Sequence, residues 1–366
     1  MALRWPRFRR SRRSPTATDS SVAGHMRSAL HLVLAGDLAA AEVQLAEAAR
    51  LDSSSSDVYL ALANLYRARG EIGRAIQIHQ NLLLRQDLPE SLRLECLLGL
   101  ALDFRAGGFL RRATASFEEL LEHDSGNVPA LRELERIRVD SGEWEEAIRV
   151  RRQIGRADPR TPQILAHLWT GLGRMHAEAG RSGEARKAYR RALSRDSECA
   201  EAYVALGDLR LEDGSPRKAI GLWRRALPLH PSLGVLLYPR LWRAHCALED
   251  LAGLEKTLAA RLEEEPGDQE ASIWVSRAIA KQGRVDDAIA PLRRVLDKSA
   301  GFLPARAEIG RILLSDKRDF EALKAFEELL DRLPVERHRL RCQACGTQDA
   351  TLHWRCPQCG EWDSFV

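Results

Sequence analysis

Four cysteines near the C-terminal end of the sequence have the residue type and spacing of a metal site. Cys342 and Cys345 form one Cys-x-x-Cys motif, and ten residues (346–355) separate it from a second motif formed by Cys356 and Cys359. Each motif can present two thiolates to one ion, and four thiolates make a tetrahedral site for zinc or a single iron. The sequence therefore predicts one bound zinc or iron ion, held by all four cysteines.

A glycine follows each motif, at Gly346 and Gly360. Glycine permits the positive φ that turns backbone amides toward the sulfurs. The intervening loop is long enough for a small β-ribbon. A segment of about 30 residues cannot build its own core, so we expect metal binding to supply most of its folding free energy. A thioredoxin-like redox pair is disfavoured because no strand-helix pattern surrounds the motifs.

The chain that leads to this segment repeats a unit of two short helices. In residues 200–233 a first helix carries Gly207, a turn follows at Gly214, and a second helix carries Ala219 and Trp223. The small residues let the two helices approach closely, and the large side chains fill the space beside them. This order, with a period near 34 residues, resembles the tetratricopeptide (TPR) repeat.

A turn glycine with a small residue five positions later marks seven of these units. The pairs are Gly36 with Ala41, Gly70 with Ala75, Gly108 with Ala113, Gly142 with Ala147, Gly180 with Ala185, Gly214 with Ala219 and Gly283 with Ala288. Two further units are degenerate, one near Glu249 and one near Lys317, which makes nine. The sequence therefore predicts an all-α superhelical solenoid, closed by a small rubredoxin-like metal ribbon.

Two steps in the repeat have 38 residues, from Gly70 to Gly108 and from Gly142 to Gly180. We expect their extra residues in the inter-repeat turns, around Pro89 and around residues 159–162, where prolines stand. The predicted domains are a basic disordered tail (1–21), the TPR array (22–334) and the metal-binding domain (335–366).

Composition excludes several classes of protein. The formal net charge of +4, with 30% charged residues, is too mild for a nucleic-acid surface. Seven cysteines, with Cys96, Cys199 and Cys246 isolated in repeat helices, argue against a secreted disulfide framework and for a reducing compartment. We expect these three to be buried small hydrophobic residues. No stretch approaches the roughly 18 consecutive apolar residues that span a bilayer.

Residues 1–21 contain six arginines, with Trp5 and Phe8 among them, and no apolar core follows as in a secretory signal peptide. Two interpretations remain open. The segment is either a disordered basic tail or a weak contact with an anionic cytoplasmic membrane leaflet, to which each basic residue adds on the order of 1 kcal/mol. We therefore expect a cytoplasmic protein, with peripheral contact at the inner membrane as the second possibility.

The sequence predicts no catalytic residues. Six histidines occur singly at repeat positions, with no nucleophile or acid at a suggestive spacing, and are assigned to packing or to the surface: His79, His123, His167, His176, His230 and His245. The glycines are explained as helix breakers and close-contact sites, so no phosphate-binding loop or small-molecule substrate is predicted. The default function of a TPR array is to bind proteins.

Arginine recurs at the ninth position of the unit, on the first helix, where it is expected to face the groove. The residues are Arg136, Arg174, Arg243, Arg277 and Arg311. They either pair with acids on adjacent helices or form a basic ladder that binds an acidic partner by charge-assisted hydrogen bonds.

The combination resembles the lipopolysaccharide assembly protein B family. The match is most specific at residues 352–362, where Leu-x-Trp-x-Cys-Pro-x-Cys-x-x-Trp is similar to the second knuckle of that family, and the resemblance extends over residues 22–366. It implies a non-enzymatic bacterial adaptor that binds the membrane AAA+ protease FtsH and the deacetylase LpxC, promotes degradation of the deacetylase and so limits lipopolysaccharide synthesis.

Members of that family begin with a transmembrane helix, and this sequence has the basic tail in its place. Three explanations stay open: a misassigned start codon, recruitment by the tail and partners, or a soluble relative with another client. Two other functions compete with the adaptor. One is a soluble TPR co-chaperone or assembly factor, and the other is a rubredoxin-type electron carrier, which would need iron with reversible redox chemistry.

Overall fold

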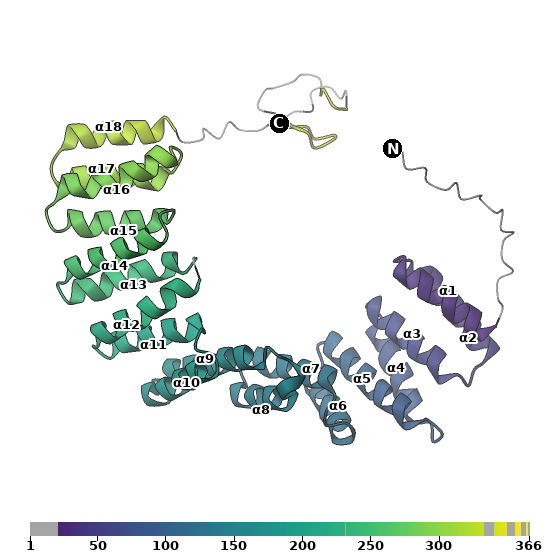
Figure 1. Ribbon diagram of the computed structural model, residues 1–366. Coiled ribbons are helices and arrows are strands. Elements are labelled where there is room, and N and C mark those ends of the chain that lie inside the picture. The colour runs from purple at the N-terminus through teal and green to yellow at the C-terminus, as the bar shows by residue number, and fades with distance from the viewer. Residues whose placement is uncertain (1–20, 231, 333–339, 350–355, 360–363, 365–366) are drawn as a thin grey trace, which may run out of the picture. The chain divides into compact units, whose positions relative to one another are not determined.

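The computed structural model describes residues 21–230, 232–332, 340–349, 356–359 and 364 (Figure 1). Eighteen α-helices follow one another in these residues, two for each of the nine predicted units, and the predicted fold class is confirmed. The predictions about the basic tail through residue 20, Gly360 and the aromatic residues of the second knuckle lie outside the described residues.

The chain divides into two compact units, residues 1–202 and 203–366. The first unit holds α1 (Val22–Leu34), α2 (Leu38–Leu51), α3 (Ser56–Ala68), α4 (Ile72–Leu83), α5 (Glu90–Ala106), α6 (Leu110–His123), α7 (Val128–Asp140), α8 (Trp144–Ile154), the short 3-10 helix η1 (Gly155–Ala157), α9 (Thr161–Glu178) and α10 (Ser182–Arg195). Helix α11 (Ala200–Glu212) crosses the division.

The second unit continues with α12 (Pro216–Ala226), η2 (Leu227–Leu229), α13 (Leu233–Ala247), α14 (Leu251–Glu264), α15 (Gln269–Ala280), α16 (Val285–Lys298), α17 (Leu303–Ser315) and α18 (Asp319–Leu330). From α1 to α10 and from α12 to α18, each helix packs on the one before and the one after it. No helix among the described residues has both the length and the apolar content that crossing a bilayer requires.

A glycine on the first helix faces an aromatic ring on the second helix in three units. The pairs are Gly173 with Tyr189, Gly207 with Trp223, and Gly310 with Phe326. A Cβ atom added to Gly207 would lie 2.3 Å from Nε1 of Trp223, far inside van der Waals contact. The indole is fully buried, and its Nε1 donates to the backbone oxygen of Val204 at 3.3 Å. Glycine is therefore needed there for the second helix to approach.

The fourth repeat, α7 with α8, has a buried ion pair in place of this glycine–aromatic contact. At the two equivalent positions stand Glu135 on α7 and Arg151 on α8, and Nε of Arg151 donates to Oε1 of Glu135 at 2.9 Å. The guanidinium also donates to Asp158 at 3.0 Å, and all three side chains are buried. Two carboxylates around one guanidinium leave no buried charge without a partner, which makes the site tolerable in the core.

The turn inside each unit requires a left-handed residue. Gly214 has φ +70°, and the other six turn glycines that the sequence marked also have positive φ. In the two degenerate units the same turn is made by Glu249, with φ +53°, and Lys317, with φ +59°. A residue with a Cβ atom is strained in this conformation, so these two turns are formed at a cost.

The extra residues of the 38-residue steps lie mainly in a helix, although the segments before α5 (84–89) and α9 (155–160) have six residues each, against four (52–55) before α3. Most of the extra residues lengthen the first helix of the unit: α5 has 17 residues and α9 has 18, whereas α3 and α7 have 13 each. Pro89 is the N-cap of α5, and Pro162 lies in the first turn of α9, where proline is compatible with a helix. The extra residues therefore lie around the predicted prolines, but most of them are helical, because four residues make about one helical turn and extend a helix without rotating its apolar face much.

We predict that Gly207→Ala lowers the free energy of unfolding of the compact unit 203–366 by roughly 1–3 kcal/mol, because the new methyl group overlaps the buried indole of Trp223. Gly221→Ala on α12 is the matched control, since nothing lies within 4 Å of the added Cβ and alanine favours the helix by roughly 1 kcal/mol. Urea unfolding followed by circular dichroism measures both. Equal stabilisation by the two substitutions would show that the close approach is not required.

Lys317→Gly should raise stability by roughly 1 kcal/mol, because it removes a Cβ atom from a left-handed turn. The control is Lys324→Gly, an exposed position inside α18, where glycine should lower stability by about the same amount. The measurement is the urea midpoint of each variant relative to that of the wild-type chain. We expect a higher midpoint for Lys317→Gly and a lower one for Lys324→Gly, and a lower midpoint for both contradicts strain at the turn.

Candidate metal centre and partner surface

A two-stranded ribbon holds the first cysteine motif. Strand β1 (Leu340–Arg341) pairs antiparallel with β2 (Gln348–Asp349), and Arg341 lies opposite Gln348. The backbone N–H of Cys342 donates to the carbonyl of Thr347 at 2.9 Å, and that of Gly346 donates to Cys342 at 2.9 Å. Gly346 has φ +79°, as predicted for the turn. The ribbon thus flanks the motif, whereas the sequence suggested a ribbon within the loop after it.

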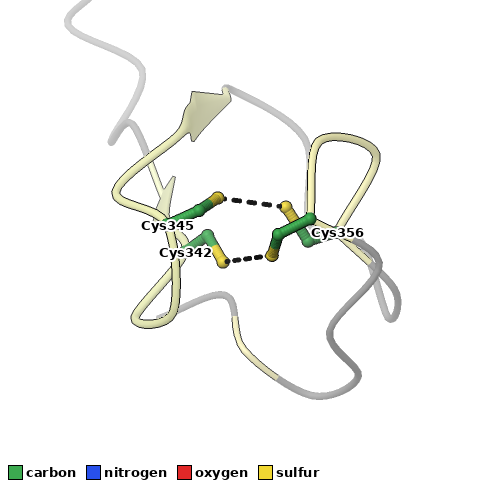
Figure 2. A group of neighbouring side chains, drawn as sticks. Cys342, Cys345 and Cys356 are labelled. Atoms are coloured by element: carbon green, nitrogen blue, oxygen red, sulfur yellow. Dashed lines mark hydrogen bonds between the residues drawn. The ribbon is translucent and has the colours of Figure 1, made fainter.

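The four cysteine sulfurs form one cluster (Figure 2). All four Sγ atoms lie within 4.8 Å of one another. The nearest pairs join the two motifs, with 3.7 Å between the sulfurs of Cys342 and Cys359 and 3.6 Å between those of Cys345 and Cys356. A tetrahedron with metal–sulfur bonds of about 2.3 Å has edges of roughly 3.8 Å, so this geometry fits zinc or a single iron. The residues present therefore suit a single metal ion.

Hydroxyl groups favour the thiolate form of two ligands. The Ser364 hydroxyl lies 3.2 Å from Sγ of Cys342, and its hydrogen bond, with help from backbone amides, lowers the pKa of Cys342 to about 6. The hydroxyl and backbone N–H of Thr347 lower the pKa of Cys345 in the same way, across a distance of 3.2 Å to the hydroxyl. Because metals bind the thiolate, both contacts reduce competition from protons.

Sequence reasoning missed these two hydroxyl groups. Thr347 stands directly after the Cys-x-x-Cys-Gly motif, so its position beside the knuckle was a usable signal. Ser364 had none, because it follows the last cysteine by five residues and reaches the first motif only through folding. Its carbonyl also accepts from the backbone N–H of Gln343 at 2.7 Å, which ties the end of the chain to the first knuckle.

The three isolated cysteines are separate from the metal cluster. Cys96 and Cys199 are buried, as predicted, and Cys246 is half-buried. Burial raises the pKa of Cys96 to about 11 and also raises that of Cys199. These two thiols therefore stay protonated and unreactive at neutral pH.

Three of the five ninth-position arginines are paired with acids: Arg174 and Arg277 with an acid on the next first helix, and Arg311 with an acid on its own helix. Arg174 on α9 pairs with Glu201 on α11. Arg277 on α15 donates twice to Glu308 on α17, from Nε at 2.7 Å and from Nη2 at 2.8 Å. Arg311 binds the same carboxylate at 3.1 Å. For these residues the structure shows the pairing that the sequence left as one of two possibilities.

The Glu308 carboxylate explains why Arg277 cannot be treated as a free surface charge. The Glu308 side chain is only 6% exposed, and burial opposes its ionisation. The hydrogen bonds from Arg277 and Arg311 nevertheless outweigh burial and lower the pKa of Glu308. Removing Arg277 leaves a buried carboxylate with one exposed partner, which costs stability. Arg277 therefore joins two repeats as well as facing outward.

Arg136 and Arg243 are exposed and have no ion-pair partner within the part of the chain that the structure describes. Arg243 lines a hollow of about 250 Å³ between α11 and α13, together with the acids Asp208 and Glu212. Asp208 is itself held by two hydrogen bonds from Arg240, at 2.8 and 3.0 Å. Arg243 is thus available for an acidic group from outside.

Two tryptophans that the sequence analysis did not single out lie on neighbouring first helices of the second unit. The rings of Trp242 on α13 and Trp274 on α15 are 5.9 Å apart. Arg277 covers Trp274 at 4.5 Å, and Lys281 covers Trp242 at 5.5 Å, as cation–π contacts. Both rings are only partly buried. We call these four residues with Arg243 the aromatic-basic surface.

Cys342→Ser is predicted to lower the zinc plus iron content from about one ion per chain to less than about half, because three sulfurs and a hydroxyl bind such metals weakly. Far-UV circular dichroism should keep its helical signal, since the helices lie outside the ribbon. Cys246→Ser, an isolated half-buried thiol on α13, is the control and should retain the metal. A full metal content in Cys342→Ser would refute the four-sulfur site.

Comparisons with known proteins agree with both parts of the structure. A family model described as "Rubredoxin metal binding domain" matches residues 341–366. Models described as "Tetratricopeptide repeat" match residues 58–93 and 130–163, and residues 170–233 and 251–301. These models describe a repeat and a metal-binding domain rather than an enzyme. Among solved structures, the one titled "Crystal structure of MamA protein" is 20% identical with a TM-score of 0.35, covering 46% of this chain and 91% of that chain.

Two curated relatives are both named lipopolysaccharide assembly protein B. The one from Escherichia coli (strain K12) is 26% identical over 331 residues, which is 86% of this chain and 81% of the relative. The one from Haemophilus influenzae is 27% identical over 318 residues, 85% of this chain and 79% of the relative. The chain is therefore a tetratricopeptide repeat protein with a C-terminal rubredoxin-type metal-binding domain, and its predicted resemblance to the lipopolysaccharide assembly protein B family is confirmed.

Proposed function

We propose that this protein is a non-enzymatic adaptor in lipopolysaccharide assembly, which brings a deacetylase of the LpxC type to the membrane protease FtsH. The observation that carries the proposal is the extent of the similarity: relatives named for lipopolysaccharide assembly align with 86% of the chain. The metal-binding family model matches the residues that cluster the four sulfurs. The protease and the deacetylase are the partners that the family resemblance implies.

The repeats support a binding role because the first helices present partly exposed aromatic and basic side chains. Arg243 has an exposed guanidinium without an ion-pair partner in the described residues, and the two partly buried tryptophans lie on the same helix and the next first helix. Aromatic rings and arginine are the residue types that contribute most to protein interfaces. The aromatic-basic surface therefore suits a segment with a carboxylate beside an apolar side chain.

We place the protein at the cytoplasmic face of the inner membrane, because the proposed protease is a membrane protein. Residues 1–21 are the part of the chain with which the adaptor would contact anionic lipid. The metal ribbon has a structural role in this proposal: its ion holds the two knuckles together and changes no oxidation state. Exchange of zinc for iron should therefore leave the adaptor competent.

The test is a reconstituted degradation assay with the protease in anionic vesicles, the purified deacetylase and this protein. The wild-type chain should shorten the half-life of the deacetylase, and Arg243→Ala should weaken binding of the deacetylase by roughly tenfold at low salt, with less effect at high salt. Arg225→Ala on α12, also exposed but on a second helix, is the control.

The outcomes separate the parts of the proposal. An unchanged half-life in the presence of the wild-type chain rejects the adaptor function for this protease and deacetylase. Equal loss of binding in Arg243→Ala and Arg225→Ala rejects the aromatic-basic surface but keeps the adaptor. With a chain that lacks residues 1–21, the deacetylase should be degraded more slowly in the vesicle assay, whereas its binding to the chain in solution should not change. Degradation in vesicles at the wild-type rate rejects the membrane contact.

A further inference from the structure

A second pocket in the second unit lies away from the aromatic-basic surface, between the second helices α12 and α14. It has a volume of about 490 Å³, within the range of small-molecule sites. Its polar lining consists chiefly of Arg217 and Arg224 from α12, His245 from the end of α13, and Asp250, Gly253 and Lys256 from the start of α14.

The three cations of this pocket are unpaired. Arg217, Arg224 and Lys256 are exposed, and no carboxylate in the described part of the chain forms an ion pair with them. Many other arginines of this protein do pair, as Arg240 does with Asp208. Three positive charges on two facing helices repel one another across the pocket, so an anion that binds there gains from all three.

Asp250 is the acid of the pocket, and its carboxylate is already in use. Oδ1 accepts from the backbone N–H of Gly253 at 2.9 Å and caps α14. The lining therefore carries three positive charges against one negative charge before His245 is counted. The N-terminal end of α14, a helix of 14 residues, adds the positive end of its dipole.

His245 supplies the observation that points to a ligand. The residue is 4% exposed, and its Nδ1 lies 2.9 Å from the carbonyl oxygen of Asp250 and 3.4 Å from the carboxylate oxygen Oδ2 of the same residue. A carbonyl oxygen can only accept, so Nδ1 carries a proton, and in the neutral form of the ring Nε2 is an acceptor. Nε2 is buried and has no hydrogen-bond partner among the described residues. A buried polar atom without a partner is rare and calls for one.

The lining therefore favours an anion that can also donate a hydrogen bond to Nε2. A phosphate group meets both conditions, because its second ionisation lies near pH 6 and part of it keeps a hydroxyl proton near neutral pH, which can be donated to Nε2. A sulfate or a carboxylate is fully ionised at neutral pH and brings no proton. We propose that the pocket between α12 and α14 binds a phosphate group, either inorganic phosphate or a small phosphate monoester.

The experiment uses the full chain at constant ionic strength and neutral pH. Isothermal titration calorimetry measures the affinity for three ligands. Inorganic phosphate and glycerol phosphate represent the two sources of the phosphate group, and sulfate is the control anion of similar size. Phosphate or its ester should bind about tenfold or more tightly than sulfate, and the tighter of the two identifies the source. The Nε2 signal of His245 in ¹⁵N-histidine spectra should shift on binding.

The control lies on the same helix. Arg217→Gln with Arg224→Gln should weaken phosphate binding by about tenfold or more, whereas Lys218→Gln with Arg225→Gln removes the same charge from α12 outside the pocket and should leave it unchanged. Equal losses in the two double variants would show a diffuse charge effect and overturn the site. So would sulfate binding as tight as phosphate, or the absence of any binding at millimolar phosphate.

Discussion

The approach of two helices within one repeat is the contact on which the array depends. In most repeats the helix pair buries its apolar side chains because one residue on the first helix is small enough to admit the large side chain of the second. Gly207 with Trp223 shows the limit of this constraint, because not even a methyl group fits. The fourth repeat has Glu135 and Arg151 at these two positions, and the buried charges are tolerable because the Arg151 guanidinium donates to both Glu135 and Asp158.

Polar contacts contribute to the packing of each repeat on its neighbour. Arg240 on α13 binds Asp208 on α11, and Arg277 on α15 binds Glu308 on α17, so the first helices are linked by bidentate ion pairs. Such pairs are geometrically selective because the planar guanidinium and carboxylate must face each other. The proposed aromatic-basic surface therefore shares Arg277 with the contacts that join repeats.

The repeat register and the metal ligands could be predicted from sequence because both are local patterns. The positive φ at Gly214 and Gly346 follows from the residue type, and four cysteines in two short motifs have few arrangements other than a common ion. Which arginines form ion pairs could not be predicted. The partner of Arg277 is 31 residues away on another helix, and the contact depends on how the repeats stack. Ser364 reaches Cys342 across 22 residues, and no spacing rule announces that contact.

The long first helices α5 and α9 have a consequence for shortening the protein by design. Four residues turn a helix by about 400°, so removing four from the N-terminal part of α5 returns every remaining side chain to within about 40° of its former direction. Removing two would rotate the apolar face by about 200° and turn it toward solvent. The 38-residue repeats can therefore be trimmed to the common length only in whole turns, and an intermediate deletion is more damaging than a longer one.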